Sequence, residues 1–437
     1  MNESSGWIKV KLGDLAEGVR GVSYQPNDLL DNYSDDSVIL LRANNIQKGQ
    51  LQLDNIQIVP RHIVKSAQYL APNDIAVCMS NGSKHLVGKS AQFSSDNYLV
   101  CTIGAFCSVF RTKKEAEPAF VKQLFHSATY QAHIDFSLSG SAINNLKNSD
   151  IESIIFNVPP KAKQQKIATI LTTIDTAIEK TEALIEKYQQ IKAGLMHDLF
   201  TRGVLPNGQL RPSFEQAPEL YQETVLGWIP KEWACEPCSA LCSRINVGIV
   251  IQPTQYYVVD GVPAFRSANV KEDGLDPTNF VYISDTSNKL LFKSQIKAGD
   301  ILSVRTGYPG TSAVVSDDFS GANAIDILIS TPNEKVLSQY LCFWINSALG
   351  KEQVLRQQGG MAQQHFNVGE MRDLKVSLPE KEEQEKIVDR LNAVVSKVKT
   401  EQTLLAKYHK QKLGLMQDLL TGKVSVTVDQ PAEASNA

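Results

Sequence analysis

The sequence predicts an α+β protein with a pseudo-twofold internal duplication, in which two similar globular domains are separated by two long antiparallel helices that form a coiled coil. Two observations lead to this prediction. The chain of 437 residues matches itself at a shift of about 220 residues, and each copy ends in a long segment with the periodicity of an amphipathic helix.

The repeat is strongest where residues 158–204 align without a gap with residues 378–424. This alignment contains 17 identities in 47 positions, whereas unrelated segments of average composition share roughly three. Further upstream the shift grows to about 224–226 residues, where Arg42 aligns with Arg266. Because the repeated unit is far longer than a solenoid repeat of about 20–50 residues, we interpret the chain as a duplicated domain whose copies can pack like the subunits of a symmetric dimer.

A long helix is predicted in each copy. From Gln164 to Phe200, apolar residues recur at steps of three and four, with charged residues between them, and the stripe repeats over residues 387–419. About 37 residues form a rod of roughly 55 Å. Pro160 and Pro379 stand just before the two starts, where proline is compatible with a first helical turn.

How the two helices pack is open from periodicity alone, because each could pack only on its own globular half. The two helices have similar apolar stripes and similar lengths, which favours pairing with each other. Duplication about a twofold axis would make this pair antiparallel, with the globular halves at opposite ends. Gly194 and Gly414 lie at matching places inside the helical pattern. Glycine there costs about 1 kcal/mol relative to alanine, so we expect close helix-crossing contacts at both.

Each globular half is expected to combine short strands with helical segments, an α+β pattern. The predicted strands and helices occupy residues 37–43, 74–79 and 118–136 in the first half and residues 261–267, 300–305 and 336–356 in the second. The segments after the paired strands differ between the copies, residues 80–93 against residues 306–319. A shared scaffold with different loops suits two different base-reading surfaces.

Composition places limits on the class of protein. Hydrophobic residues are 42% and charged residues 21%, as in ordinary globular proteins, and the start of the chain has neither a basic leader nor an apolar stretch. We therefore expect a cytoplasmic protein that does not bind membranes. Seven cysteines in irregular positions fit a reducing compartment. With a formal net charge of −3, any DNA-binding surface must be local.

Candidate DNA contacts are polar residues in the loops of each half. Amide side chains can pair with adenine and arginine with guanine, while lysines suit phosphates. The candidates are Arg42, Ser80, Asn81, Lys84, His85, Asn144, Asn145 and Lys147 in the first half, and Arg266, Arg305, Thr306, Tyr308, Gln363, Gln364 and His365 in the second. Because Arg42 and Arg266 repeat, a framework salt bridge or a phosphate contact suits them better than base discrimination.

Three motifs resemble catalytic or metal sites without fulfilling their requirements. Residues 82–90 resemble a P-loop, but five residues separate the glycines where a phosphate cradle uses four. Residues 157–160 resemble the Asn-Pro-Pro-aromatic motif of adenine methyltransferases, but a valine interrupts it. Cys235, Cys238 and Cys242 have zinc-like spacing without a second ligand pair. We expect no cofactor and no catalytic residue in this chain.

The two-copy plan resembles the specificity subunits of type I restriction–modification enzymes, the HsdS family. The resemblance rests on VPPKAKQQKIATIL and LPEKEEQEKIVDRL at the helix starts, on GLMHDLFTRGV and GLMQDLLTGKV at their ends, and on the linker LPNGQLRPSF…LGWIPKEW. It covers nearly the whole chain. One departure is Lys163, where the family usually has an acidic residue before glutamine, whereas Glu383 matches the pattern.

The resemblance implies a non-catalytic subunit that reads a bipartite, asymmetric DNA target. The implied parts are a target recognition domain over residues 1–158, a central helix over 159–203, a linker over 204–232, a second target recognition domain over 233–378, a distal helix over 379–421 and a flexible tail over 422–437. The helices would dock two methyltransferase subunits, with restriction subunits joining the complex. Gln164, Lys166, Gln384 and Lys386 are the candidate partner contacts.

Two other classes of function stay open at this point. A scaffold with two protein-binding heads would have the same duplication without binding DNA. A diverged enzyme could use the loop of residues 82–90 on a nucleotide. S-adenosylmethionine, ATP and magnesium would belong to the partner subunits if the resemblance holds.

Overall fold

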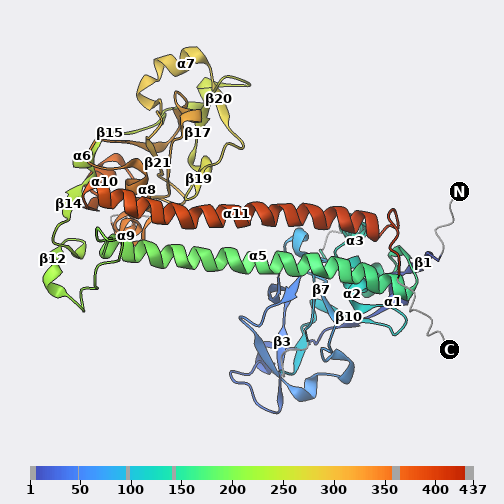
Figure 1. Cartoon of the computed structure of the whole chain (residues 1–437). Helices are drawn as coiled ribbons and strands as arrows, with labels where there is room; N and C mark the ends of the chain where they lie inside the picture. Colours follow the sequence, from blue (N-terminus) through green and yellow to red (C-terminus); the bar gives the residue numbers. More distant parts are fainter. Residues whose placement is uncertain (1–5, 48, 95–98, 140–143, 357–364, 429–437) are drawn as a thin grey trace, which may run out of the picture. The chain divides into compact units, whose positions relative to one another are not determined.

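The structure is a computed structural model that describes residues 6–47, 49–94, 99–139, 144–356 and 365–428. It divides into two compact units: unit 1 comprises Met1–Glu182 and Leu404–Ala437, and unit 2 comprises Ala183–Thr403. We call the globular part of unit 1, from β1 to β11, head 1, and the globular part of unit 2, from β14 to β25, head 2 (Figure 1).

The first and last strands of head 1 form a two-stranded sheet, in which β1 pairs antiparallel with β11. Its larger sheet has the order β2-β10-β7-β8-β5-β4, and a third sheet has the order β6-β3-β9 with β9 parallel to β3. The strands are β1 (Ile8–Lys11), β2 (Ala16–Arg20), β3 (Ser37–Leu41), β4 (Ile46–Gln47), β5 (Gln50–Leu51), β6 (Gln57–Pro60), β7 (Ile75–Cys78), β8 (Ser90–Gln92), β9 (Cys101–Ile103), β10 (Cys107–Thr112) and β11 (Ile155–Val158). The helices are α1 (Leu12–Leu15), α2 (Pro118–Leu124), α3 (Ala128–Ser139) and α4 (Asn148–Glu152).

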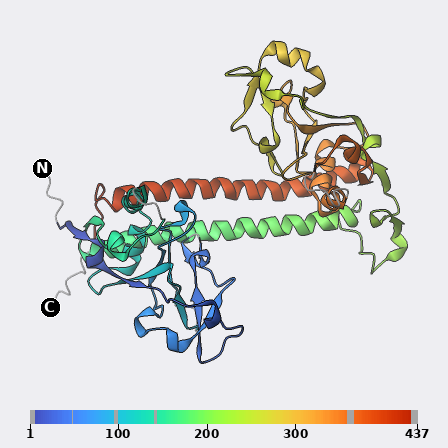
Figure 2. The same ribbon diagram turned by 180° about the vertical axis from the view of Figure 1, so that it is seen from behind.

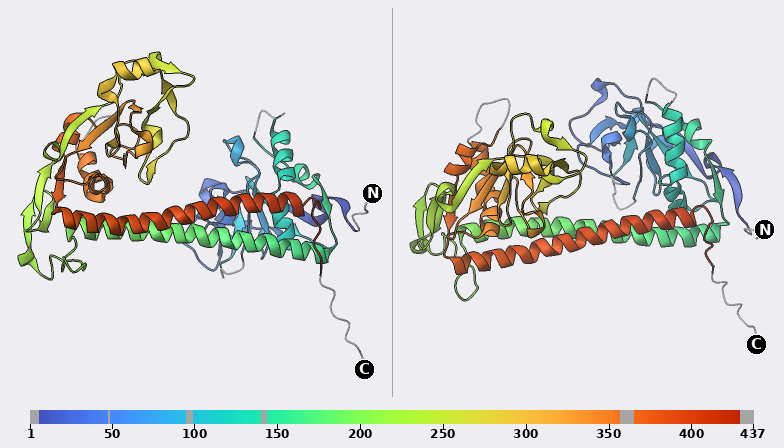
Figure 3. Two further views of the ribbon diagram at one scale, coloured as in Figure 1. Left: turned by 45° about the horizontal axis from the view of Figure 1, so that its top comes forward. Right: turned by 90° about the horizontal axis from the view of Figure 1, so that it is seen from above.

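Head 2 repeats this plan, and its path can be followed from yellow-green to orange in Figure 3. Its sheets have the orders β14-β25, β15-β24-β21-β22, β16-β20-β17-β23 and β18-β19. The strands are β14 (Ala234–Pro237), β15 (Cys242–Val247), β16 (Tyr257–Val258), β17 (Val262–Phe265), β18 (Val270–Lys271), β19 (Gly274–Leu275), β20 (Val281–Ile283), β21 (Ile301–Val304), β22 (Ser312–Val314), β23 (Asn323–Ala324), β24 (Ile327–Pro332) and β25 (Lys375–Leu378). The helices are α6 (Cys238–Leu241), α7 (Asp285–Leu290), α8 (Ser338–Asn346), α9 (Ala348–Arg356) and α10 (Val368–Asp373). In the linker before this head, β12 (Tyr221–Thr224) and β13 (Gly227–Pro230) form a hairpin.

The predicted α+β duplication is confirmed in the main strand pairs, while β16 and α7 are additions in head 2. The parallel pair β3–β9 of head 1 recurs as β17–β23 in head 2, and the antiparallel pairs β10–β7 and β1–β11 recur as β24–β21 and β25–β14. The two heads therefore have the same framework.

The single helix predicted in each head is two helices. Ser127 lies between α2 and α3, where its Oγ donates to the Leu124 carbonyl and accepts from the amide of Tyr130. Ser347 does the same between α8 and α9, with the Trp344 carbonyl and the amide of Gly350. A serine hydroxyl that accepts from an amide three residues on caps a new helix, so both heads break the helix at the same place.

In unit 1 the long helix α5 (Lys161–Thr201) begins beside the end of α11 (Lys381–Leu419). Ile167 and Leu171 of α5 share one buried cluster with Met416 and Leu419 of α11 and with Phe120 of head 1. The start of one helix thus packs on the end of the other, and the helices are antiparallel here (Figure 2).

In unit 2 the end of α5 packs against the start of α11. Met196 and Leu199 of α5 share a buried cluster with Ile387 and Leu391 of α11 and with Trp344 of head 2. The helices are therefore antiparallel in this unit as well. Packing of each helix on its own half alone is the wrong alternative, because each helix end packs both on a head and on the other helix.

The prediction of close helix crossings at Gly194 and Gly414 is wrong. A Cβ placed on either glycine would meet nothing within 4 Å. The close backbone approaches lie in the heads, where a Cβ on Gly21 or Gly248 would collide with a backbone carbonyl of the neighbouring chain segment. Among the described residues, no helix is long and apolar enough to span a membrane.

Candidate nucleic-acid interface

The predicted contact residues of head 1 converge where the loop after β7 meets the segment before α4. Ser80 and Asn145 form an isolated antiparallel β-bridge, and the Asn144 amide nitrogen donates to the Gly82 carbonyl at 3.1 Å. The amide of Asn81 donates to the Asn144 carbonyl at 3.3 Å. The candidates Ser80 and Asn81 are thus brought together at one edge of the sheet with Asn144 and Asn145, which lie more than 60 residues later in the chain.

The remaining candidates of this edge, Lys84, His85 and Lys147, are exposed. Lys84 and His85 lie in a single turn of 3-10 helix over Lys84–Leu86, and both side chains are exposed. Lys147 precedes α4, where its backbone amide donates to Asp150 while its ammonium group faces solvent. Exposed lysines are suited to screened phosphate contacts.

Head 2 brings its candidates together at the matching place. The hydroxyl of Thr306 lies 3.0 Å from Nδ1 of His365, and Tyr308 is 82% exposed in the same loop. Two further candidates of this head, Gln363 and Gln364, lie outside the described residues.

Arg305 differs from the other candidates because its charge is already neutralised. Its guanidinium forms an ion pair with Asp326, and its Nε donates to the Phe366 carbonyl at 3.4 Å. A guanidinium held in this way must first leave its carboxylate before it could pair with a guanine.

The repeated arginines belong to the framework. Arg42 and Arg266 each precede a 3-10 turn in which their amides donate to Asn45 and Asn269. Their guanidinium groups donate to backbone carbonyls, that of Arg266 to Asn279 at 2.8 Å. No salt bridge forms at either arginine within the described residues, so the predicted framework role is met by hydrogen bonds to the main chain.

An open groove of about 840 Å³ lies next to this edge of head 1. Three predicted residues line it, namely Arg42, Ser80 and Asn81, together with residues that the sequence did not single out, such as Asn44 and Phe106. Phe106 is 69% exposed. Phe106 stands in the apolar run of residues 99–110, which reads as a buried strand, so no sequence signal marks it as exposed.

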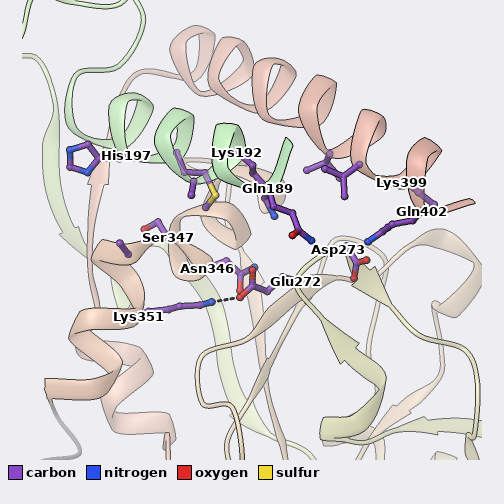
Figure 4. A pocket seen from close by; sticks show the side chains of 15 residues that line it. Gln189, Lys192, His197, Glu272, Asp273, Asn346, Ser347, Lys351, Lys399 and Gln402 are labelled. Carbon is purple, nitrogen blue, oxygen red and sulfur yellow. Dashed lines mark hydrogen bonds and ion pairs between the residues drawn. The ribbon is translucent and has the colours of Figure 1, made fainter. Parts of the chain in front are cut away.

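A second cavity, of about 510 Å³, lies within unit 2 between the two long helices, the α8–α9 turn and the β18–β19 hairpin. Figure 4 shows Lys351 pairing with Glu272 across its mouth, while Lys192 and Lys399 project from the helices. The matching place in unit 1 is occupied by an ion pair of Asp175 with Lys412 at 2.6 Å.

The predicted partner contacts Gln164 and Gln384 have another role, because both side chains are buried. The Gln164 amide accepts from the backbone of Glu117 and donates to Pro159, and Gln384 makes the matching bonds to Leu337 and Pro379. These glutamines fasten each long helix to its head, so we withdraw them as direct partner contacts.

Of the two lysines predicted beside these glutamines, Lys166 is exposed. The ammonium group of Lys386 donates to the Pro206 carbonyl of the linker at 3.1 Å. Glu383 holds the same linker through an ion pair with Arg211 and accepts from the amide of Val204. At the corresponding position of the first long helix stands Lys163, which has no carboxylate and so cannot form the ion pair that Glu383 forms with Arg211.

The P-loop-like segment over residues 82–90 does not have the geometry of a phosphate cradle. It runs into strand β8 and not into a helix, and the amides of Leu86, Val87 and Gly88 donate to backbone carbonyls. Burial raises the pKa of Cys242 to about 12 and also raises the pKa of Cys238. In the part of the chain that the structure describes, no cluster of metal-ligating side chains is present.

These features define a class: a double-headed binding protein whose two heads share one framework and differ at one exposed edge. A family model described as the type I restriction modification DNA specificity domain matches residues 4–190 and 252–408. The chain therefore belongs to the family of type I restriction–modification DNA specificity domains.

Two relatives are named as specificity subunits of type I restriction enzymes. The EcoKI type I restriction enzyme specificity subunit of Escherichia coli (strain K12) is 29% identical over 300 residues, which cover 69% of this chain and 61% of that protein. The StySPI specificity subunit of Salmonella potsdam is 34% identical over 186 residues, covering 43% of this chain and 40% of that protein. The matched part of the chain thus spans less than two thirds of the length of either relative.

One solved structure shows the same fold. The crystal structure of the type I restriction–modification S subunit from M. genitalium has a TM-score of 0.57 and 13% sequence identity, with 98% of both chains covered.

Proposed function

We propose that this chain is the DNA-sequence specificity subunit of a type I restriction–modification enzyme. In this role head 1 and head 2 act as target recognition domains for the two halves of a bipartite, asymmetric site. The observation that carries the proposal is the duplication itself: the main strand pairs of the framework repeat, while the exposed edge formed by Ser80 and Asn145 in head 1 carries Thr306 and His365 in head 2.

Different side chains on one framework are what the reading of two different sequences requires. Base edges in the major groove are distinguished by the donors, acceptors and apolar groups that a protein presents to them. Among the described residues, the edge of head 1 presents the amides of Asn81, Asn144 and Asn145, whereas that of head 2 presents Thr306 and Tyr308. We therefore assign amide-based reading to head 1 and a different set of contacts to head 2.

In this proposal the chain performs no chemical step. Two methyltransferase subunits dock on the long helices, and ATP-dependent restriction subunits join that complex. S-adenosylmethionine, ATP and magnesium are then used by these partners. Lys166, which is exposed on the first turns of α5, remains a candidate contact for one methyltransferase subunit.

The test is reconstitution with the modification partner, read by single-molecule sequencing of methylated adenines. The chain alone should transfer no methyl groups, and the complex should modify one split motif with a gap of constant length. Asn81→Ala should relax base preference in one half of the motif and Thr306→Ala in the other, each by about ten-fold.

Two results would contradict the proposal. Methyl transfer by the purified chain without a partner would show that it is itself an enzyme. An assembled complex that protects no specific DNA sequence would favour the alternative of a scaffold with two protein-binding heads.

A further inference from the structure

We propose that Phe106 is a base-reading residue of head 1, which contacts the methyl group of a thymine in the DNA major groove. The inference rests on the proposed function and names the base that this groove recognises. It starts from the unusual combination of a large apolar side chain that is exposed and a backbone that is held firmly in place.

The position of Phe106 is fixed by hydrogen bonds on both sides. Its carbonyl accepts from the amides of Met79 and Ser80 at 2.8 and 3.1 Å, and the turn that contains it is closed by a bond from Cys107 to Gly104 at 2.8 Å. The ring itself is 69% exposed and adds little to the core. Single exposed hydrophobic residues are common on protein surfaces. Phe106 differs from these in that it also lines a groove of about 840 Å³.

The groove beside the ring offers polar groups suited to the same base pair. Asn44 and Asn81 line it together with Phe106. The hydroxyl of Tyr24 donates to Oε1 of Gln57 at 2.7 Å, which orients a third amide on the groove wall. Asparagine and glutamine pair bidentately with N6 and N7 of adenine, and a phenyl ring is a suitable neighbour for the C5 methyl group of thymine. An A·T pair presents both features in the major groove.

Among the residues that the structure describes, head 2 has no equivalent of this arrangement. The position that corresponds to Phe106 holds Asp326, whose carboxylate is paired with Arg305. The position that corresponds to Tyr24 holds Ile251, which is 80% exposed. The thymine contact is therefore assigned to head 1 and to one half of the target.

The experiment replaces each thymine of the target in turn by deoxyuridine, which removes only the C5 methyl group. Binding is measured with the assembled methyltransferase complex that carries wild-type chain, Phe106→Ala or the matched head 2 variant Tyr308→Ala. We expect one thymine whose replacement weakens wild-type binding about four-fold, the effect of one buried methyl group. That penalty should vanish in Phe106→Ala and persist in Tyr308→Ala.

Phe106→Ala should fold normally because the ring is exposed, and its thermal unfolding should match that of the wild type. The inference is overturned if the variant keeps the deoxyuridine penalty at every thymine. It is also overturned if the variant weakens binding to all sequences equally, since the ring would then be a non-specific wedge. If instead the wild-type complex binds no specific DNA, the proposed function itself fails.

Discussion

Head 1 and head 2 each contain a buried aspartate at the corresponding position, and an arginine from a different strand neutralises it in each head. Asp74 stands directly before β7 and Asp300 directly before β21, and both side chains are buried. In head 1 the counter-ion is Arg111 on β10, with an N–O distance of 2.6 Å. In head 2 it is Arg244 on β15, also at 2.6 Å.

The strand register explains the exchange. Arg111 lies opposite Glu17 in the β10–β2 pair, and Thr331 lies opposite Arg244 in the matching β24–β15 pair. The arginine has moved to the opposite strand. In the interior, both heads therefore keep a buried aspartate with a counter-ion. The residues at the exposed edge bear no such constraint and differ between the heads.

The largest effect is expected when this ion pair is broken. Arg111→Thr copies the residue of head 2 but leaves Asp74 buried without its counter-ion, which should lower the free energy of unfolding of unit 1 by about 3 kcal/mol. Adding Glu17→Arg should restore most of that loss, because it recreates the geometry of Arg244. Chemical denaturation followed by hydrogen exchange in head 1 peptides measures both steps. Equal stability of the single and the double variant would show that an arginine at position 17 does not replace Arg111 as the counter-ion of Asp74.

The glutamines that fasten the helices should differ in importance. Gln164→Ala removes bonds to Glu117 and Pro159 and should cost about 2 kcal/mol. Gln384 makes a further bond to the Lys335 carbonyl at 3.0 Å, so Gln384→Ala should cost about 1 kcal/mol more. Thermal unfolding of both variants provides the measurement, and a larger loss for Gln164→Ala would contradict this ranking.

Acid should weaken unit 1 more than unit 2. Burial and the charges of Lys412 and Lys122, opposed by Asp175, lower the pKa of His126 to about 4. Between about pH 6.5 and pH 4 the unfolded chain then binds a proton that the folded chain does not, so stability falls as the pH falls through this window. From pH 7 to pH 5 the loss should be about 1–2 kcal/mol.

The control for this pH dependence comes from head 2, which has Asn346 at the corresponding position. His126→Asn should remove the part of the pH dependence that belongs to unit 1. Hydrogen exchange at pH 7 and pH 5 compares the peptides of the two heads, and an unchanged slope in the variant would show that another group titrates.

The smallest effect is expected at the two helix glycines. Gly194→Ala and Gly414→Ala add a methyl group where nothing lies within 4 Å, so each should stabilise the chain by about 0.5–1 kcal/mol through helix propensity. Differential scanning calorimetry of the chain alone tests this. If either variant also fails to assemble with a methyltransferase subunit, that face of the helix is covered in the complex.

Much of the fold follows from the sequence because the deciding patterns are local or repeated. The stripe over residues 164–200 predicts α5 to within a few residues, since helix periodicity depends on near neighbours. The order β2-β10-β7-β8-β5-β4 could not be predicted, because strand pairing depends on contacts that are distant in the chain.

The candidate site was predictable only in part, for the same reason. Ser80 and Asn145 were chosen as loop residues, but their pairing is a tertiary contact. Gln164 and Gln384 stood out through their identity in the two copies, and identity in a repeat marks shared structure as readily as shared binding. Phe106 was missed because its exposure depends on a turn that cannot be recognised within the apolar run around it.

The division of the chain has a consequence for its synthesis. The core of unit 1 contains Met416, Leu419 and Leu420, which are synthesised after the whole of head 2. Nascent head 1 therefore exposes the apolar side chains of Ile167 and Leu171 throughout translation of head 2, a state in which chaperones bind and truncated products aggregate. A premature stop codon anywhere before α11 would thus damage head 1 as well as truncate unit 2.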